Sequence, residues 1–394
     1  MTRSLLSLAA AMLLSGCAVA PPPEPALSSA DTARLRQAGA EVLFWSQEQR
    51  DANFRTMETI FPTRMIRAGG RARPLAQGAP LPVDETMIEE FVESQNIAAL
   101  IVLQDGRIRL ERYARGFTPE QRWTSFSVAK SLTSTLVGAA VRDGHIASLD
   151  DPVTRYVPEL AGSAYDGVSV RHVLTMSSGV RWNEDYTDPA SDVARMFAEP
   201  PPEGMDVTVA YLRKLPRAAE PGTRWNYNTA ETNLIGVVVS RAVGKPLARY
   251  ASERIWRPYG MEADAFWQLD ERGHEIAGCC ISARARDYAR IGQFMLDGGR
   301  AGRRDVLPAG WVAEATRLHH PVSPRGDGYG YQWWTLDRGY IARGIFGQSI
   351  RIDPERRLVM VTLGAWPAAS DGPRSIARET FFRHVGARIE QEGR

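Results

Sequence analysis

A serine and a lysine three residues apart, Ser127 and Lys130, form the pattern that most directly suggests covalent chemistry. Residues at this spacing share one face of a helix, so the hydroxyl and the amine would be neighbours. A serine hydroxyl attacks a carbonyl well only when a base takes its proton, and a buried lysine with a lowered pKa can be that base. The pattern favours Ser127 as a nucleophile and Lys130 as its proton acceptor, the alternative being an ordinary helix start with a solvated lysine.

The use of lysine in this chain supports that interpretation. Lys130, Lys214 and Lys245 are the only lysines, and all other Lys/Arg positions are arginine. Arginine does not give up its proton in proteins, whereas lysine does when it is buried. If Ser127 begins a helix, its backbone N–H has no partner within the helix and can face the oxyanion of a tetrahedral intermediate.

Two further segments carry candidate site residues. The loop 221–229 starts with a Pro-Gly turn and presents Tyr227, whose phenol beside a lysine ammonium would have its anion favoured and could relay a proton. The segment Gly344-Ile345-Phe346-Gly347-Gln348 lies between two predicted strands. Glycine there allows close approach, and the N–H of Ile345 is a candidate second oxyanion donor. A structural loop tyrosine and glycines at a bulge are the alternatives.

The elements that must position these residues follow from periodicity and turn signals. Residues 28–60 are expected to be helical and residues 61–82 to form an irregular arm. Apolar runs flank Gln104-Asp105-Gly106, which predicts a hairpin of residues 96–102 and 107–113. Further helices are predicted over 127–143, 170–176, 232–243, 285–296 and 375–389, and strands over 329–336, 339–343, 348–352 and 358–363.

This order predicts an α/β (α+β) fold made from both ends of the chain. Residues 86–394 are expected to form the catalytic domain. Within it, residues 86–126 and 276–394 would build the α/β lobe, with a mainly helical lobe of residues 127–275 inserted between them.

The three motifs, in the order S-x-x-K, tyrosine loop and glycine strand, resemble the serine β-lactamase and penicillin-binding superfamily. The resemblance is strongest to the class C-like branch with esterases and 6-aminohexanoate-oligomer hydrolases. It covers roughly residues 55 to 390 and includes the segments 61–64, 176–179, 182–186, 188–192 and 282–287. It implies a β-lactamase/transpeptidase-like fold, with an antiparallel sheet flanked by helices and an inserted helical lobe, and no cofactor.

The resemblance also implies a role for each site residue. Ser127 would be acylated, Lys130 would accept its proton and Tyr227 would be the general acid/base, with the N–H groups of Ser127 and Ile345 as the oxyanion hole. Tyr186 would face the substrate, or alternatively pack. Substrate-binding positions are also expected at Asn228 and Gly344.

Two departures from the superfamily narrow the expected substrates. Ala342-Arg343-Gly344 stands where β-lactamases carry Lys-Thr-Gly, and Arg343 alternates away from the place of that lysine. Thr229 stands where an asparagine is usual. Both favour a serine hydrolase acting through an acyl-enzyme on small carboxylic esters or linear amides. The alternatives are a D-alanyl peptidase or β-lactamase-type activity, or a non-catalytic lipoprotein that serves as a binding module.

The rest of the sequence bears on location and partners. Residues 1–17 resemble a lipoprotein signal peptide with Cys17 as the lipidation site, and residues 18–85 would be a proline tether and N-terminal arm. We expect a bacterial cell-envelope protein anchored by lipid, and Ala18 favours the outer membrane facing the periplasm. A plain secretory signal is the alternative. The net charge of +2 gives no basic field for nucleic acid. The sequence does not indicate an oligomeric state.

The remaining cysteines and the histidines suggest no further chemistry. Cys279 and Cys280 are interpreted as small buried residues that do not pair, because a disulfide between neighbours is strained. The spacing of cysteines and histidines matches no zinc motif, so no metal site is expected.

Overall fold

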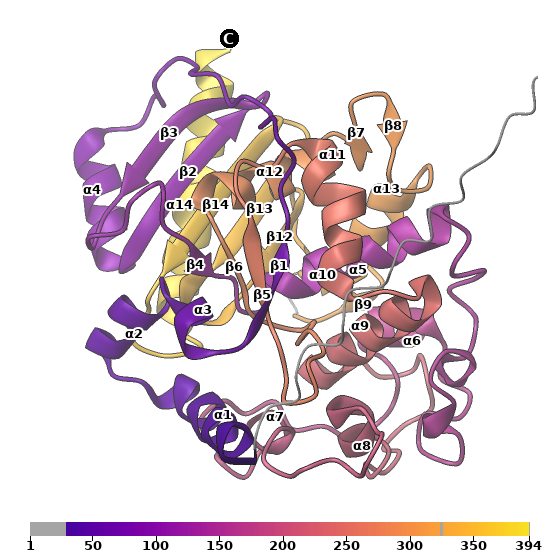
Figure 1. Cartoon of the computed structure of the whole chain (residues 1–394). Coiled ribbons are helices and arrows are strands. Elements are labelled where there is room, and N and C mark those ends of the chain that lie inside the picture. Colours follow the sequence, from indigo (N-terminus) through magenta and orange to yellow (C-terminus); the bar gives the residue numbers. More distant parts are fainter. Residues whose placement is uncertain (1–28, 324–325, 394) are drawn as a thin grey trace, which may run out of the picture.

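An eight-stranded antiparallel sheet forms the larger layer of the computed structural model (Figure 1). The structure describes residues 29–323 and 326–393, so the predicted signal peptide, Cys17 and the proline run of the tether lie outside the described residues. The strand order is β3-β2-β14-β13-β12-β11-β10-β9. In that order the strands are Arg107–Tyr113, Ile97–Gln104, Leu358–Gly364, Ser349–Asp353, Tyr340–Arg343, Trp334–Thr335, Gly328–Tyr329 and His320–Pro321.

Both ends of the catalytic region contribute to this sheet, as the sequence predicted. The hairpin β2–β3 turns at Asp105 and Gly106, which both have positive φ, and β2 pairs with β14 from the C-terminal part of the chain. The predicted strand 329–336 is instead two short strands, β10 and β11. They are separated at Gln332, which has a left-handed φ of 61°.

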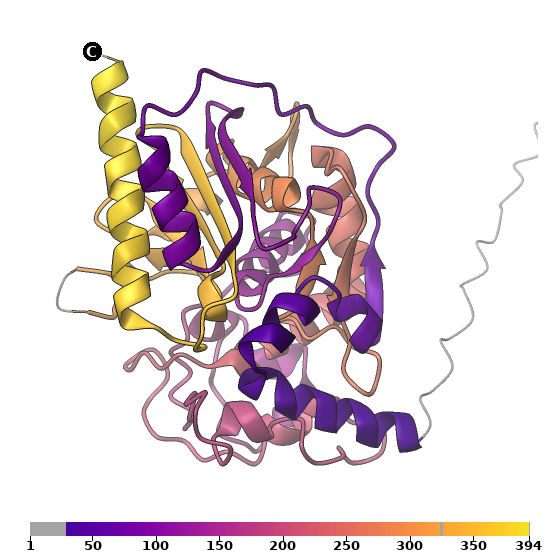
Figure 2. The same ribbon diagram turned by 90° about the vertical axis from the view of Figure 1, so that its left-hand side faces the viewer.

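Helices cover the two faces of the sheet. On one face α4 (Glu85–Ser94) lies beside α14 (Gly372–Glu392) (Figure 2), and Phe91 stacks on Phe381 with ring centroids 3.9 Å apart. On the other face α12 (Ala285–Leu296) packs on β2, β13 and β14. Gly292 of α12 lets that helix approach closely, because a Cβ there would lie 2.4 Å from a methyl group of Val359.

A second sheet of four short strands connects the N-terminal arm to the middle of the chain. Its order is β1-β5-β6-β4, with bounds Thr63–Ile66, Ala265–Gln268, Ile281–Ala283 and Trp123–Thr124. β1 lies in the segment 61–82 that was expected to be irregular, and β5 lies inside the range expected to be mainly helical. Neither strand has a long alternating pattern. Their pairing with distant residues defines them, and a single sequence does not reveal that pairing.

The central helix α5 (Val128–Arg142) is buried over most of its length and packs on α9 (Thr229–Val243). α9 begins three residues earlier than predicted, because Asn228 caps it. The region around them contains η2 (Val153–Arg155), η3 (Pro158–Leu160), α6 (Val170–Leu174), α7 (Asp192–Arg195), α8 (Val207–Leu212), α10 (Leu247–Ala251), η4 (Ser252–Trp256) and α11 (Arg257–Tyr259).

The N-terminal arm begins with short helices that contact residues far away in the sequence, such as Glu271 and Ala365. They are α1 (Ser29–Glu41), η1 (Val42–Phe44), α2 (Gln47–Asn53) and α3 (Met57–Ile60), so the predicted helical stretch is broken into four pieces. The remaining elements are the hairpin β7–β8 (Arg300–Ala301 and Arg304–Asp305), α13 (Trp311–Thr316) and η5 (Ile345–Gly347). Within the described residues, no helix is long and apolar enough to cross a membrane.

Candidate active site

Ser127 and Lys130 lie where the sequence predicted them, at the start of the buried helix α5. Ser127 is the residue before the first turn, and Lys130 Nζ lies 2.9 Å from Ser127 Oγ. The lysine is 1% exposed, and its ammonium also donates to the carbonyl oxygen of Gly278 at 2.7 Å. Burial lowers the pKa of Lys130 to about 8, so roughly a tenth of the amine is neutral at pH 7 and can accept a proton.

The backbone around Ser127 is held in an uncommon conformation. Phe126 has a φ of 42°, in the left-handed region that non-glycine residues rarely adopt. Ser125 fixes the segment to strand β6, because its N–H donates to the carbonyl of Ile281 and its hydroxyl accepts the N–H of Ile281 at 2.9 Å. These bonds aim the N–H of Ser127 into the site, where it makes no hydrogen bond to any described residue.

Ile345, which starts η5, lines the same cavity as Ser127. Gln348 Nε2 donates to the Ile345 carbonyl at 3.2 Å, and the next residue, Phe346, has a φ of 60° and donates its N–H to Ala369. The N–H of Ile345, like that of Ser127, has no acceptor within the described residues. Two free N–H groups beside one hydroxyl are the arrangement that stabilises an oxyanion.

Gly344 is explained by close packing between the two sides of the site. A Cβ at this position would lie 2.6 Å from the carbonyl oxygen of Ser125, so a larger residue would push β12 away from the start of α5. Gly344 thus allows β12 to approach the start of α5, and its expected contact with substrate stays a prediction.

Tyr227 lies beside Ser127 and Lys130, but the pKa of its phenol shifts in the direction opposite to the expectation. Lys130 Nζ lies 5.3 Å from the centre of its ring, and the nearby Ser127 side chain acts to lower the pKa of its hydroxyl. The ring also stacks on Trp334 with centroids 5.6 Å apart. Burial and the nearby charge of Glu184 raise the pKa of Tyr227 well above its usual range. The favoured phenolate that the sequence suggested is therefore wrong, and Tyr227 is a neutral phenol.

Glu184 is the important site residue that sequence reasoning did not identify. Its carboxylate accepts the Tyr186 hydroxyl at 2.7 Å and the Thr229 N–H at 3.0 Å, and it also bonds the indole of Trp182 and the Thr229 hydroxyl. Its charge raises the pKa of Lys130 and Tyr227. The segment 182–186 was noted as a family-like stretch, but only the contact with Thr229, 45 residues away, places Glu184 beside the lysine.

Of the two other predicted substrate-binding side chains, Tyr186 lies at the cavity and Asn228 lies at the start of α9. Tyr186 lines the cavity beside Ser127, as expected of a substrate-facing residue. Asn228 is 1% exposed, and its Oδ1 accepts the N–H of Glu231 at 3.1 Å. Asn228 thus caps α9 through Oδ1, while its Nδ2 has no hydrogen-bond partner among the described residues, and its expected contact with substrate stays a prediction.

Arg343 does not take the place of the missing family lysine. Its guanidinium lies 3.7 Å from the carboxylate of Glu379 on α14 and 5.4 Å from the ring centre of Trp334. Among the described residues, those that line the cavity do not include Arg343. Its outward alternation along β12 is therefore confirmed.

A cavity of about 390 Å³ opens beside Ser127 and Ile345. Its walls come from α1, η1, α7, the loop after β5 and the segment 276–280, and they are mostly apolar. A largely apolar cavity with a few convergent polar groups is typical of a small-molecule site.

Cys279 and Cys280 line this cavity and are joined in a disulfide. The expectation that they do not pair is therefore wrong. Cys280 has a φ of 72°, and the Cys279 carbonyl accepts the indole N–H of Trp267 at 3.2 Å. The pair directly follows Gly278, whose carbonyl holds Lys130. The argument from ring strain considered the two residues alone and missed the loop conformation that brings their sulfurs together.

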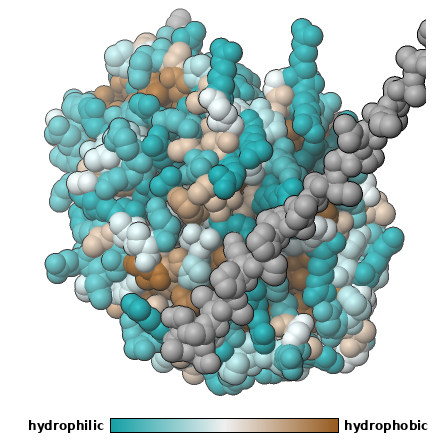
Figure 3. Space-filling model, viewed as in Figure 1, coloured by the Kyte–Doolittle hydropathy of each residue, from teal (hydrophilic) through white to brown (hydrophobic). Residues whose placement is uncertain are grey.

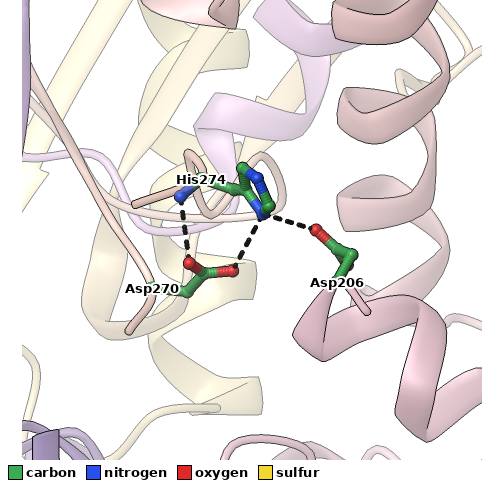
Figure 4. Close-up of side chains that lie close together, drawn as sticks. All are labelled: Asp206, Asp270 and His274. Atoms are coloured by element: carbon green, nitrogen blue, oxygen red, sulfur yellow. Dashed lines mark hydrogen bonds and ion pairs between the residues drawn. The ribbon is translucent and has the colours of Figure 1, made fainter. Parts of the chain in front are cut away.

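Asp206, Asp270 and His274 form a cluster of ligand-type side chains (Figure 4), and Asp270 also lines the cavity. His274 Nδ1 is 2.8 Å from Asp206 Oδ2 and 3.9 Å from Asp270 Oδ2. The other carboxylate oxygens accept backbone N–H groups, from Val209 to Asp206 and from Arg272 and His274 to Asp270. The hydrogen bond to Asp206 raises the pKa of His274, and contacts within the protein therefore account for the cluster.

Comparison with known proteins agrees with this geometry. The Beta-lactamase family model matches residues 85–377. The chain is 34% identical over 341 residues to the 6-aminohexanoate-dimer hydrolase of Paenarthrobacter ureafaciens, covering 80% of this chain and 85% of that protein. It is 31% identical over 190 residues to Esterase EstB of Burkholderia gladioli, covering 43% and 46% of the two chains.

Solved structures show the same fold. A Bacillus anthracis protein that carries the provisional name 6-aminohexanoate-dimer hydrolase superposes with a TM-score of 0.76 at 22% identity, covering 85% of this chain and 93% of that one. A family VIII carboxylesterase superposes with a TM-score of 0.61 at 16% identity, covering 81% and 99%. With its serine, lysine and tyrosine in one site and the family match spanning most of the described residues, the chain belongs to the Beta-lactamase family of serine hydrolases.

Proposed function

We propose that this hydrolase cleaves carboxylic esters and linear amides through an acyl-enzyme on Ser127. The observation that carries the assignment is the buried Lys130, whose Nζ lies 2.9 Å from Ser127 Oγ and whose pKa is lowered to about 8. A group that must accept a proton near neutral pH works best with a pKa close to that pH. An ordinary solvated lysine would stay charged, so burial of this amine supports a catalytic role.

The proposed reaction uses each group of the site in turn. Neutral Lys130 takes the proton of Ser127 as Oγ forms a bond to the substrate carbonyl carbon. The N–H groups of Ser127 and Ile345 stabilise the resulting oxyanion. Tyr227 gives its proton to the leaving oxygen or nitrogen and regains one from the Lys130 ammonium; its raised pKa keeps it protonated for this step. Water then attacks the acyl-enzyme by the reverse proton route and releases the acid.

The charges around the site favour substrates without a carboxylate. Arg36 is the one cation among the described residues that line the cavity, and it is bound by Glu271 through two hydrogen bonds of 2.5 and 2.8 Å. Arg343 is paired with Glu379. A β-lactam or a peptide ending in D-alanine would therefore bring a carboxylate to a site that offers no free cation.

A panel of four substrates tests this proposal, each measured with the wild type and with Ser127→Ala. The panel is p-nitrophenyl butyrate, hexanoyl anilide, a chromogenic β-lactam and a peptide ending in D-alanyl-D-alanine. We expect turnover of the ester and the anilide that is lost in the variant, and at most weak turnover of the other two. Efficient release of D-alanine or β-lactam opening, with the ester left intact, would contradict the proposal.

We also propose that the mature protein is lipid-anchored at Cys17 in the bacterial cell envelope. The support is the sequence alone, in which Leu14-Ser15-Gly16-Cys17 follows a short apolar run and a proline tether follows the cysteine. Incorporation of labelled palmitate into the full chain, but not into Cys17→Ser, is the expected result. Equal recovery of both proteins in the soluble fraction would contradict it.

A further inference from the structure

The residues that line the cavity beside Ser127 indicate which part of the substrate binds there. We infer that it is the acyl-binding site for neutral, apolar acyl chains, and that α1 and η1 form the wall that sets this preference. This inference rests on the proposed function. It goes further by naming the acyl group that the enzyme prefers.

The position of the cavity assigns it to the acyl side of the reaction. It is lined by Ser127, the proposed nucleophile, by the adjacent Phe126 and by Ile345, the proposed second oxyanion donor. Tyr227, which delivers the proton to the leaving group, is not among its described lining residues. The leaving group therefore departs toward Tyr227, and the acyl chain extends into the cavity.

The walls of the cavity are mostly apolar. Apolar side chains come from the N-terminal arm, from α7 and from the segment after β5; they include Leu35, Val42, Leu43, Val193, Met196 and Ile276. Burying a methylene group gains about 0.8 kcal/mol, which corresponds to roughly fourfold in affinity. A chain of several methylenes therefore gains much more here than an acetyl group.

The charged residues that line the cavity already form ion pairs or hydrogen bonds with other residues of the protein. Arg36 and Glu271 hold each other in a bidentate ion pair, and Glu271 is 9% exposed. Asp270 accepts two backbone N–H groups and lies beside His274. A charged acyl chain would have to break one of these arrangements or remain unpaired, and both cost free energy.

The N-terminal wall is a feature of this chain outside the matched family region. The family match begins at residue 85, whereas α1 and η1 end at residue 44. The Arg36–Glu271 pair joins α1 to the loop after β5, and Trp45 packs on Phe54 with ring centroids 6.1 Å apart. On the face shown in Figure 3, hydrophobic surface is visible in the lower left, in the area where Figure 1 places these N-terminal helices.

A chain-length series with matched variants on α1 tests the inference. The substrates are p-nitrophenyl acetate, butyrate and octanoate, together with the p-nitrophenyl ester of 6-aminohexanoate as the charged analogue. Leu35→Glu places a carboxylate in the apolar wall. Arg34→Glu is the matched control, because Arg34 is exposed on the same helix and is not a lining residue.

For the wild type we expect kcat/KM to be at least tenfold higher for octanoate than for acetate, and higher for octanoate than for the aminohexanoyl ester. Leu35→Glu should reduce the octanoate-to-acetate ratio at least tenfold, and Arg34→Glu should keep it. The inference would be overturned if the wild-type kcat/KM for acetate equalled or exceeded that for octanoate. It would also be overturned if the octanoate-to-acetate ratio were the same in Leu35→Glu and Arg34→Glu.

A binding measurement separates this inference from the proposed function. Octanamide and acetamide are titrated calorimetrically into Ser127→Ala protein, which needs no turnover. Tighter binding of octanamide, lost in Ser127→Ala/Leu35→Glu and retained in Ser127→Ala/Arg34→Glu, supports the acyl site even if Ser127 is not the nucleophile. Equal affinity for the two amides would overturn the acyl site even if Ser127 is acylated.

Discussion

Phe126 and Phe346 pack against each other with ring centroids 5.3 Å apart, and each is the direct neighbour of a residue that offers a free N–H to the site. Both have left-handed φ angles, 42° and 60°, and both rings also contact Phe54, the residue that follows α2. The packing of these three rings fixes the distance between Ser127 and Ile345. The oxyanion hole therefore depends on aromatic packing behind it as well as on the two backbone groups themselves.

Replacing Lys130 by arginine tests its role as a base. Lys130→Arg keeps the positive charge but removes the ability to accept the Ser127 proton, so kcat/KM for p-nitrophenyl butyrate should fall at least about a hundredfold. Lys214→Arg is the matched control, because Lys214 is exposed and bonds only Glu199 at the surface. Rates near those of the wild type in Lys130→Arg would remove this lysine from the mechanism.

Removing the hydroxyl of Tyr227 tests proton delivery to the leaving group. Tyr227→Phe keeps the stacking on Trp334 and the ring face toward Lys130, so we expect kcat to fall about a hundredfold with little change in KM. Tyr156→Phe, which loses a hydroxyl bonded to Asp151, should behave as the wild type. An unchanged kcat in Tyr227→Phe would contradict the proposed relay.

The pH dependence of turnover reports the charge state of Lys130. Because the neutral amine is the active form, kcat/KM should rise with pH and reach half of its plateau near pH 8. The charge of Glu184 raises the pKa of Lys130, so Glu184→Gln should lower that pKa and move the rising limb to lower pH. Asp185→Asn, at an exposed neighbour, should leave the limb in place. If the rising limb of kcat/KM moved to higher pH, or did not move, in Glu184→Gln, the effect of Glu184 on the pKa of Lys130 would be refuted.

The disulfide next to Gly278 should affect catalysis through Lys130. Reduction frees the segment whose carbonyl accepts the Lys130 ammonium at 2.7 Å. Loss of one such bond is worth about 0.5–1.5 kcal/mol, so kcat/KM should fall roughly two- to tenfold on treatment with a phosphine reductant. Cys279→Ser/Cys280→Ser is the control, since its rate should not respond to the reductant. An equal response of both proteins would exclude the disulfide as the cause.

The sequence predicted the parts of this site that local rules determine. Ser127 and Lys130 share a helix face by spacing alone, and the hairpin around Asp105-Gly106 and the helix 285–296 follow from turn chemistry and periodicity. The remaining parts depend on contacts between distant residues. The contact between Glu184 and Thr229 joins residues 45 positions apart, and β1 and β5 are defined by their pairing with each other and by the pairing of β5 with β6.

Protonation was also beyond the reach of sequence reasoning. A lysine beside Tyr227 suggested a phenolate, but burial and the charge of Glu184 have the larger effect and keep the phenol neutral. The buried position of Asn228 and its role in capping α9 likewise follow from the fold and not from the polar loop sequence. Electrostatics of this kind depends on the surroundings of a group, which the fold determines.

The central claim, that Ser127 carries the acyl group, is tested most directly by intact-mass spectrometry of protein quenched shortly after mixing with p-nitrophenyl butyrate. We expect one butyryl group, located by peptide mapping on Ser127, that is absent from Ser127→Ala together with the release of p-nitrophenol. A butyryl group on another residue, or continued turnover by Ser127→Ala without an adduct, would contradict the account.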